Sequence, residues 1–207
     1  MCIKETTAML NDQFLNRSNK DRAFIVGVDG LGGAGKTTFS KKVARALIEA
    51  DYNVTIFHLD DHIVEMSKRY QTGHEEWYEY YYLQWDIKRI ITNLLEPLHN
   101  CHQTLLPFYD KSTDSISTKR IDILANSIVI IEGIFLQRKE WKSFFDFIVF
   151  VDCPFEVRRQ RVLYRDSYIG DIQVRLKKYT ERYWVGERHY IRTVKPATIA
   201  DLVIRAN

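Results

Sequence analysis

The chain has 207 residues, of which 45% are hydrophobic and 28% charged, a balance suited to one globular domain with a sizeable core. Its 30 Lys and Arg against 27 Asp and Glu leave a formal net charge of +3, too small to indicate a nucleic-acid partner by itself. No apolar run approaches the roughly 18 residues that span a bilayer, and residues 1–20 lack the features of a signal peptide. We therefore predict one soluble, cytoplasmic domain over residues 1–207 with no membrane partner.

The cysteines give no sign of a cross-linked or metal-bound framework. Cys2, Cys101 and Cys153 are scattered, odd in number and without C-x-x-C spacing. This pattern argues against both a disulfide scaffold and a zinc site. We expect reduced thiols.

Regular structure is first indicated by the apolar run at residues 23–28, which has the pattern of a buried strand. A glycine-rich stretch follows, and apolar residues then recur at helical spacing from about Thr37 to Ala50. Residues 53–59 have the pattern of a second short strand. This order of strand, loop, helix and strand is typical of an α/β domain.

The middle of the chain, about residues 62–123, has the character of an insertion on this core. Residues 75–98 show helical spacing, and we expect Pro97 to end that helix because proline has no backbone N–H. Residues 104–123 are polar, with short apolar pieces on either side of a turn. This predicts a hairpin that projects from the main sheet.

The last third of the chain returns to alternating strands and helices. Residues 127–131 and 147–151 are continuous apolar runs, typical of strands covered on both faces, and the first is followed directly by Glu132. Residues 155–192 are helical in pattern and rich in arginine, and residues 200–204 have the pattern of a last strand. Together these elements predict a parallel sheet.

The stretch Gly30-Leu-Gly-Gly-Ala-Gly-Lys-Thr37 matches the P-loop pattern G-x-x-x-x-G-K-[ST], and it lies between a buried strand and a helix as that pattern requires. Glycines let successive N–H groups point at phosphate oxygens, and the amino end of the helix adds positive potential. The predicted cradle consists of Gly30, Gly32, Gly33, Ala34, Gly35, Lys36, Thr37 and Thr38. We therefore predict the α/β P-loop NTPase fold, a mostly parallel sheet sandwiched by helices.

The P-loop implies a bound nucleoside triphosphate, ATP or another, together with Mg²⁺. Lys36 can reach the β- and γ-phosphates as a point charge, and the Thr37 hydroxyl can bind the metal ion. Glu132 follows its strand in the manner of a Walker B acid and is the second predicted metal residue, either directly or through water. The alternative for Glu132 is a solvated strand end.

Besides Glu132, two further features point to a kinase within this fold. Asp60 and Asp61 follow the second strand, at the edge where open α/β sheets bind ligands, so Asp60 is predicted as the general base and Asp61 as a neighbour of the acceptor. A helix cap is the alternative for such a pair, because Asp accepts hydrogen bonds from free N–H groups. The P-loop nearby favours the catalytic interpretation.

The second feature is a row of arginines. Arg158, Arg161 and Arg165 share one helix face, and planar guanidinium groups suit the charge on a phosphoryl group in its transition state. We predict that Arg158 and Arg161 bind the nucleotide and that Arg165 takes part in catalysis, all on a lid. The alternative is a solvated basic face that pairs with Glu156 or Asp166.

The aromatic block from Trp77 to Trp85 is the best clue to the acceptor, because aromatic rings can stack on a base or a sugar. We select Trp77 and Tyr81 as acceptor-binding residues. About half of the block is expected to lie in the core instead.

These residues together resemble the uridine kinase and phosphoribulokinase family of P-loop kinases, from about Phe24 to Ile204. The resemblance implies that Asp60 is the general base and Glu132 the magnesium-linked acid. It also implies that the arginine helix is a mobile lid. The segments that match in order are the P-loop, Asp60-Asp61, Leu106-Pro-Phe-Tyr109-Asp110, Val129-Ile-Ile-Glu132-Gly133, Phe150-Val-Asp152 and Arg158-x-x-Arg161-x-x-x-Arg165-Asp166.

The resemblance further implies that Tyr109 and Asp110 belong to an acceptor pocket. In members that phosphorylate uridine and cytidine, a His and an Arg follow this pair, whereas residues 111–117 here contain neither. The chain also reads Asp60-Asp61-His62-Ile63, where the family has Phe-Tyr after the small or acidic residue that follows the aspartate.

We predict an ATP-dependent, magnesium-requiring kinase that phosphorylates a hydroxyl of a small metabolite, first of all a nucleoside such as uridine or cytidine. Pantothenate, a sugar or a sugar phosphate is the alternative acceptor. A regulatory NTPase that hydrolyses its nucleotide and acts on a protein partner is the alternative of another class. No nucleic-acid partner is expected, and a homo-oligomer is compatible with the sequence.

Overall fold

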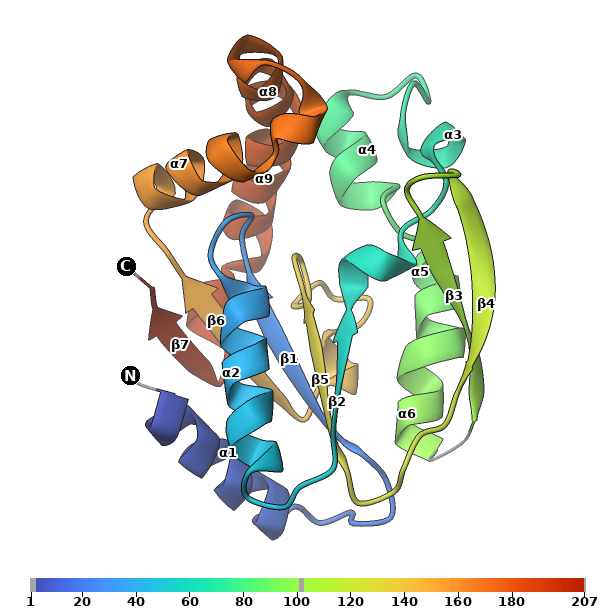
Figure 1. Ribbon diagram of the computed structural model, residues 1–207, viewed down its shortest axis with the longest axis vertical. Helices are drawn as coiled ribbons and strands as arrows, with labels where there is room; N and C mark the ends of the chain where they lie inside the picture. The colour runs from blue at the N-terminus through green and yellow to red at the C-terminus, as the bar shows by residue number, and fades with distance from the viewer. Residues whose placement is uncertain (1–2, 101–102, 207) are drawn as a thin grey trace.

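The computed structural model describes residues 3–100 and 103–206. A five-stranded parallel sheet forms its centre, in the order β2-β5-β1-β6-β7, which confirms the predicted α/β fold (Figure 1). The strands are β1 (Phe24–Gly30), β2 (Val54–His58), β5 (Ile128–Gly133), β6 (Phe147–Asp152) and β7 (Leu202–Arg205).

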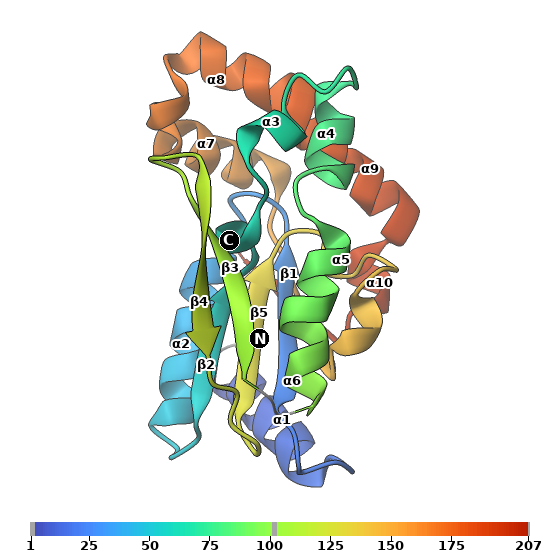
Figure 2. The ribbon, with the colours of Figure 1, turned by 90° about the vertical axis from the view of Figure 1, so that its right-hand side faces the viewer.

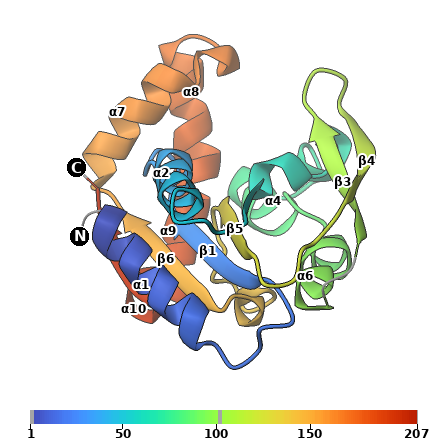
Figure 3. The ribbon, with the colours of Figure 1, turned by 60° about the horizontal axis from the view of Figure 1, so that its bottom comes forward.

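Alternate residues of the central strands enter two separate cores, as the two-residue period of a strand requires. Val26 and Ile130 face α1 (Ile3–Asn16) and α2 (Lys36–Ile48), which cover one face of the sheet (Figure 3). Ile25 and Val129 enter the other core, which is covered by the helices described next. Burial on both faces explains why these strands are continuous apolar runs in the sequence.

The second face is covered by helices from the middle and the end of the chain. The middle helices are α4 (Glu76–Tyr82), α5 (Ile87–Ile90), the π-helical η2 (Ile91–Leu95) and α6 (Glu96–Asn100). The later ones are α9 (Trp184–Val194) and α10 (Pro196–Ile199), with the short η3 (Lys142–Phe144) ahead of β6. No helix within residues 3–100 or 103–206 has the length and apolarity that a membrane crossing needs.

The helix predicted over residues 75–98 is interrupted in the structure, and it also ends later than predicted. Residues 83–86 separate α4 from α5, and Pro97 lies inside helical structure that runs on to Asn100, so the prediction that Pro97 ends the helix is wrong. A proline in a helix clashes with the carbonyl four residues earlier, here that of Asn93. The π-helical turn over Ile91–Leu95 rearranges those hydrogen bonds and lets the helix continue.

The predicted hairpin is present and is formed by β3 (Thr104–Asp110) and β4 (Ser115–Ile121), paired antiparallel and outside the main sheet. It lies beside the π-helical segment η2 and α6 (Figure 2), where the Asn93 amide donates to the Leu105 carbonyl at 3.0 Å. Its other attachment is to η1 (Leu59–His62), where His62 Nδ1 lies 2.7 Å from the Pro107 carbonyl oxygen.

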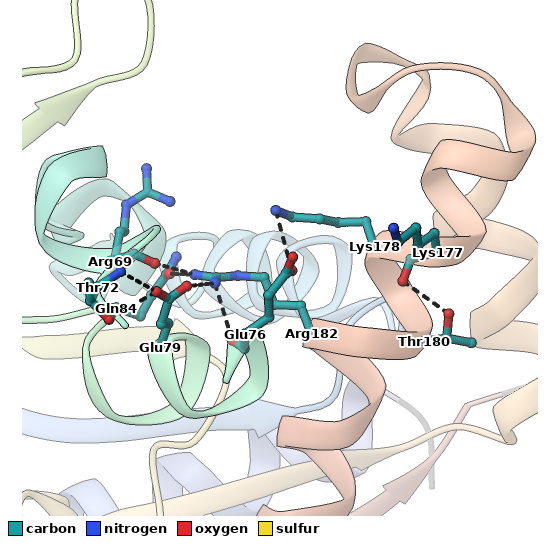
Figure 4. A network of polar contacts seen from close by, with 9 residues as sticks. All are labelled: Arg69, Thr72, Glu76, Glu79, Gln84, Lys177, Lys178, Thr180 and Arg182. Atoms are coloured by element: carbon teal, nitrogen blue, oxygen red, sulfur yellow. Dashed lines mark hydrogen bonds and ion pairs between the residues drawn. The ribbon is translucent and has the colours of Figure 1, made fainter. Parts of the chain in front are cut away.

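The arginine-rich segment forms α7 (Phe155–Arg165), η4 (Ser167–Ile169), α8 (Ile172–Lys178) and the π-helical η5 (Tyr179–Tyr183), which continues into α9. Arg182 of η5 is fully buried and joins this segment to α3 (Met66–Arg69) and α4 (Figure 4). It donates to Glu79 Oε2 at 3.0 Å, to the Glu76 carbonyl at 3.1 Å and to the Arg69 carbonyl at 2.9 Å.

Two further outcomes concern the first helix and the cysteines. The helix α1 was not predicted, although its buried residues Thr6, Leu10 and Phe14 follow a four-residue spacing. Cys153 is a buried free thiol, as expected, whereas Cys2 and Cys101 lie outside the described residues.

We predict that α1 contributes to the stability of the domain through Phe14. This ring is 4% exposed and packs edge-on against Phe24 and Tyr52. Phe14→Ala should lower the free energy of unfolding by about 3 kcal/mol, measured by urea denaturation. The matched control is Leu15→Ala, because Leu15 is 51% exposed on the same helix. Equal losses in the two variants would contradict the packing role of α1.

Candidate active site

The P-loop connects β1 to α2 at the carboxyl edge of the sheet. Gly33 and Gly35 have φ angles of 77° and 94°, a left-handed conformation that favours glycine. A Cβ atom on Gly33 would lie 2.8 Å from the Val162 side chain and 2.9 Å from the Arg158 carbonyl oxygen. The glycines therefore serve two needs, the curl of the loop and its close packing on α7.

Two buried carboxylates hold this loop, and neither was singled out in the sequence. Asp29 accepts from the Gly30 N–H at 2.8 Å and from the Tyr190 hydroxyl at 2.6 Å. Glu187 of α9 accepts from the Gly32 N–H at 2.8 Å. Burial raises the pKa of both carboxyl groups, and the hydrogen bonds lower it in part. Asp29 lies on an apolar strand and Glu187 on a helix, and nothing in the sequence pattern distinguishes either acid from an ordinary polar residue of such a segment.

Thr37 and Glu132 are brought together as predicted. The Thr37 hydroxyl donates to Glu132 Oε1 at 2.7 Å, and His58 Nδ1 lies 2.7 Å from the same oxygen. The strand register causes this, because Glu132 pairs with Val28 on one side and His58 on the other. His58 was not predicted to belong to the site.

The oxygen donors of Thr37 and Glu132 suit Mg²⁺, which prefers oxygen ligands and takes several of them from water and phosphate. No cluster of three or more His, Cys, Asp or Glu side chains that could hold a metal ion is found in the part of the chain that the structure describes. A site with few protein ligands fits a metal ion that is completed by the nucleotide. The residues present therefore fit Mg²⁺ bound together with a triphosphate.

Asp60 lies on η1, directly after β2. The side chain of Asp60 is exposed to solvent, yet the surrounding protein raises the pKa of this carboxyl group by desolvation. The positive charge of Lys36 lowers this pKa and the negative charge of Glu132 raises it, whereas Lys111 and Asp61 contribute less. Solvent therefore reaches this carboxylate although protein surrounds it. The electrostatic interactions with Lys36 and Glu132 place Asp60 beside the P-loop, and we refer to the space between Asp60 and the P-loop as the cleft.

The three arginines of α7 differ in their surroundings. Arg158 is 6% exposed, and its guanidinium pairs with Glu187 at 2.9 Å and donates to the Cys153 and Gly32 carbonyls at 3.1 and 3.2 Å. Nε and Nη1 of this predicted nucleotide-binding lid residue thus contact protein groups and hold Arg158 against the P-loop. Arg161 Nη1 lies 3.3 Å from the Gly33 carbonyl oxygen, at the edge of the loop.

Arg165 follows the alternative stated for the arginine row, a solvated position paired with Asp166. It pairs with Asp166 at 2.6 Å, and this hydrogen bond raises the pKa of Arg165. Its side chain is 64% exposed at the end of α7. The arginine is therefore anchored at its own end of the helix.

The predicted acceptor residues fall into two groups. The Tyr109 hydroxyl donates to Asp114 at 2.9 Å and accepts from Arg69 at 3.1 Å, at the tip of the hairpin beside α3. Asp110 is exposed and accepts two hydrogen bonds from Ser112, which lower the pKa of Asp110 and stabilise the turn.

Trp77 and Tyr81 lie elsewhere. Tyr81 is 5% exposed and packs on Phe135 and His189, so the prediction of an acceptor contact for Tyr81 does not agree with its place in the core. Trp77 packs on His189 as well and donates from its indole N–H to Glu75. The helical turn of α4 directs these rings toward α9.

A sequence model of the Phosphoribulokinase / Uridine kinase family matches residues 25–205. The chain belongs to this family. It is therefore a P-loop kinase that transfers a phosphoryl group to an alcohol group. Its similarity to known members is moderate, which leaves room for differences in the acceptor.

Two similar proteins show how closely this kinase resembles known sequences and structures. It is 28% identical over 151 residues to a uridine kinase of Staphylococcus haemolyticus, which covers 69% of this chain and 68% of that protein. A solved structure described as a possible uridine kinase from Bacillus stearothermophilus is 39% identical, with a TM-score of 0.80 over 99% of this chain and all of that one.

A more distant structure shares the fold alone. D-glycerate 3-kinase from Cryptococcus neoformans is 11% identical, with a TM-score of 0.69 over 98% of this chain and 95% of that one. The architecture is thus common to proteins of different names.

We predict that Glu187 keeps the P-loop of this kinase in its binding conformation. Glu187→Gln removes the charge that pairs with the buried Arg158 guanidinium and should weaken ATP binding about 10-fold, since charged hydrogen bonds contribute roughly 1.5–3 kcal/mol. Isothermal calorimetry measures the affinity. Glu181→Gln, at an exposed position on the preceding turn, is the control and should bind as the wild type does. Identical affinities in all three proteins would rule out this role.

Proposed function

We propose that this kinase transfers the γ-phosphoryl group of ATP, with Mg²⁺, to a hydroxyl of a small metabolite in the cytoplasm. The observation that carries the proposal is the solvent-accessible Asp60 carboxylate in a cleft beside Lys36 and Glu132. A base in that position can receive a proton from an acceptor that stands next to a bound triphosphate.

In this mechanism most of the catalysis is positioning and charge stabilisation. The N–H groups of residues 30–38 bind the phosphates, and Lys36 stabilises the negative charge that develops on the transferred group. Asp60 accepts the proton of the attacking hydroxyl. Thr37 and Glu132 would hold Mg²⁺, which supplies further charge neutralisation when bound.

Arg161 is the α7 arginine whose position best fits nucleotide binding, because a Cβ atom on Gly35 would lie 3.9 Å from its Nη1 atom. Arg165 could add charge only if it exchanged Asp166 for a phosphoryl oxygen. We therefore assign Arg161 to the nucleotide and keep Arg165 as a proposed lid residue.

Two acceptor classes are proposed. The names of the similar proteins favour a nucleoside such as uridine or cytidine. Pantothenate, a sugar or a sugar phosphate is the second class, and Lys111 favours it. This cation at the hairpin turn interacts with Asp60, in a segment that has no His or Arg over residues 111–117. Coupled measurement of ADP production against a panel of these acceptors tests both classes. ADP released at the same rate with and without every acceptor would instead support a regulatory NTPase.

We predict that Asp60→Asn lowers kcat by about 10²–10⁴-fold and leaves ATP binding nearly unchanged, because general-base assistance acts in the chemical step. Asp61→Asn is the comparison variant: as a predicted neighbour of the acceptor, Asp61 affects KM for the acceptor, and the variant should retain most of kcat. A loss of only a few-fold in Asp60→Asn would reject Asp60 as the base.

The raised pKa of Asp60 predicts the direction in which pH changes both the activity and the stability of the protein. Activity needs the carboxylate form, so kcat should fall as the pH drops through this raised pKa, above the ordinary value of 3.8. Asp60 is more easily protonated in the folded protein than in the unfolded chain, so its ionisation at neutral pH costs stability. Asp60→Asn should therefore melt at a slightly higher temperature than the wild type at pH 7 and at the same temperature near pH 3.

Lys36→Ala should weaken ATP binding and lower kcat together, because the ammonium group contacts phosphates in the ground state and in the transition state. Calorimetry and steady-state rates measure the two effects. The neighbouring exposed Lys41 provides the control variant Lys41→Ala. Wild-type ATP affinity in Lys36→Ala would contradict the placement of the triphosphate.

A further inference from the structure

Arg69, the last residue of α3, is a buried cation whose hydrogen-bond partners are neutral. Its exposed fraction is 6%. Nε donates to the Val64 carbonyl at 2.8 Å, and Nη2 donates to the Tyr109 hydroxyl at 3.1 Å. Among the ion pairs within residues 3–100 and 103–206, none includes Arg69. The Nη1 donors find no acceptor in those same residues.

Two other cations in this part of the fold do have acid partners. Arg182 pairs with Glu79 at 3.0 Å, and Lys178 of α8 pairs with Glu76 at 3.6 Å. Figure 4 shows the Arg69 carbonyl within this network, whereas its guanidinium points away from the network. The charge of Arg69 is therefore directed elsewhere.

Aromatic rings compensate only part of the cost of burying this charge. The guanidinium carbon lies 4.8 Å from the Tyr70 ring centre and 5.2 Å from that of Tyr109. Asp114 is linked to Arg69 through the Tyr109 hydroxyl, which it holds at 2.9 Å. A buried cation is strongly stabilised when an anion completes its hydrogen bonds, and a planar guanidinium suits a carboxylate or phosphate in particular.

Several contacts place Arg69 on the acceptor side of the cleft. The His62–Pro107 hydrogen bond joins η1 to β3 two residues from both Asp60 and Tyr109. Lys111, two residues beyond Tyr109, interacts electrostatically with Asp60. Tyr168 of η4 interacts electrostatically with both Asp60 and Tyr70, the residue that follows Arg69.

We propose that the phosphoryl acceptor carries an anionic group, a carboxylate or a phosphate ester, and that Arg69 binds it beside Tyr109. The proposal rests on the kinase function proposed above and narrows its acceptor. The anion lies at one end of the cleft and the reacting hydroxyl lies at Asp60. Pantothenate and sugar phosphates then take precedence over neutral nucleosides, and Lys111 adds a second positive charge near the same group.

The test compares acceptors that differ only in the anion. Pantothenate is paired with pantothenol, in which an alcohol replaces the carboxylate, and ribose 5-phosphate is paired with ribose; uridine completes the panel. ADP production gives kcat/KM for each compound with the wild type, Arg69→Gln, Arg69→Lys and the control Lys178→Gln. Lys178 is the matched control because its charge is close by but already paired with Glu76.

We expect the wild type to prefer the charged member of at least one pair. In Arg69→Gln, kcat/KM for that compound should fall by about 10- to 100-fold, as expected for a lost charged hydrogen bond, with kcat/KM for its neutral partner and KM for ATP nearly unchanged. Arg69→Lys should recover part of the loss, and Lys178→Gln should resemble the wild type. Equal use of charged and neutral partners by the wild type, or equal losses for both in Arg69→Gln, would overturn the proposal.

A structural role for Arg69 predicts a different pattern. If Arg69 only joined α3 to the hairpin, Tyr109→Phe, which removes the hydroxyl and keeps the charge, would lower kcat/KM equally for both members of a pair. That result would overturn anion binding even if Arg69→Gln failed to fold.

A separate readout distinguishes failure of the kinase function. Inorganic phosphate is titrated by calorimetry into protein saturated with a non-hydrolysable ATP analogue and Mg²⁺, so that the P-loop is filled. Binding by the wild type that is lost in Arg69→Gln and partly retained in Arg69→Lys supports the anion site even if no compound in the panel is phosphorylated. Absence of turnover would then count against the proposed function, and absence of phosphate binding to the wild type would count against Arg69.

Discussion

Two buried carboxylates of the protein fix the backbone of the P-loop in the absence of any bound phosphate. Asp29 bonds the Gly30 N–H and Glu187 bonds the Gly32 N–H, so acids far apart in sequence fix the backbone of one short loop. The buried Arg158 neutralises Glu187 and contacts the same loop through the Gly32 carbonyl. Nucleotide binding therefore starts from a preorganised nest, and the conformational cost is met in folding rather than in binding.

The proposed acceptor side, formed by the hairpin β3–β4 and α3, is attached to the rest of the domain in a different way. The hairpin β3–β4 lies outside the five-stranded sheet. Leu106 anchors it in the same core as Val129 and Ile131, and His62, Arg69 and Tyr109 add polar contacts between the hairpin and the segment that contains η1 and α3. Such an attachment allows the acceptor side to vary while the nucleotide side is kept. This fits a family whose structural neighbours share the fold and carry different names.

The sequence predicted the sheet, the P-loop and the meeting of Thr37 with Glu132, because each depends on short-range pattern and on the fact that parallel strands end at one edge. The environments of Arg158 and Tyr81 could not be read in the same way. Each side chain is buried by α9, whose position relative to α7 and α4 is set by packing between segments distant along the chain. Helical spacing identifies a face, but it does not say which element will cover that face.

Arg182 limits how this enzyme can move. Its guanidinium, buried and bonded to Glu79 and to two backbone carbonyls, ties η5 to α3 and α4 across the molecule. Separating them would break this ion pair and both hydrogen bonds at once. Any closing motion must therefore pivot ahead of η5, in the stretch from the end of α7 through α8, where Tyr164 and Tyr168 are 90% and 75% exposed. In any such motion, the contacts of Arg182 would keep η5 and α9 in place on α3 and α4.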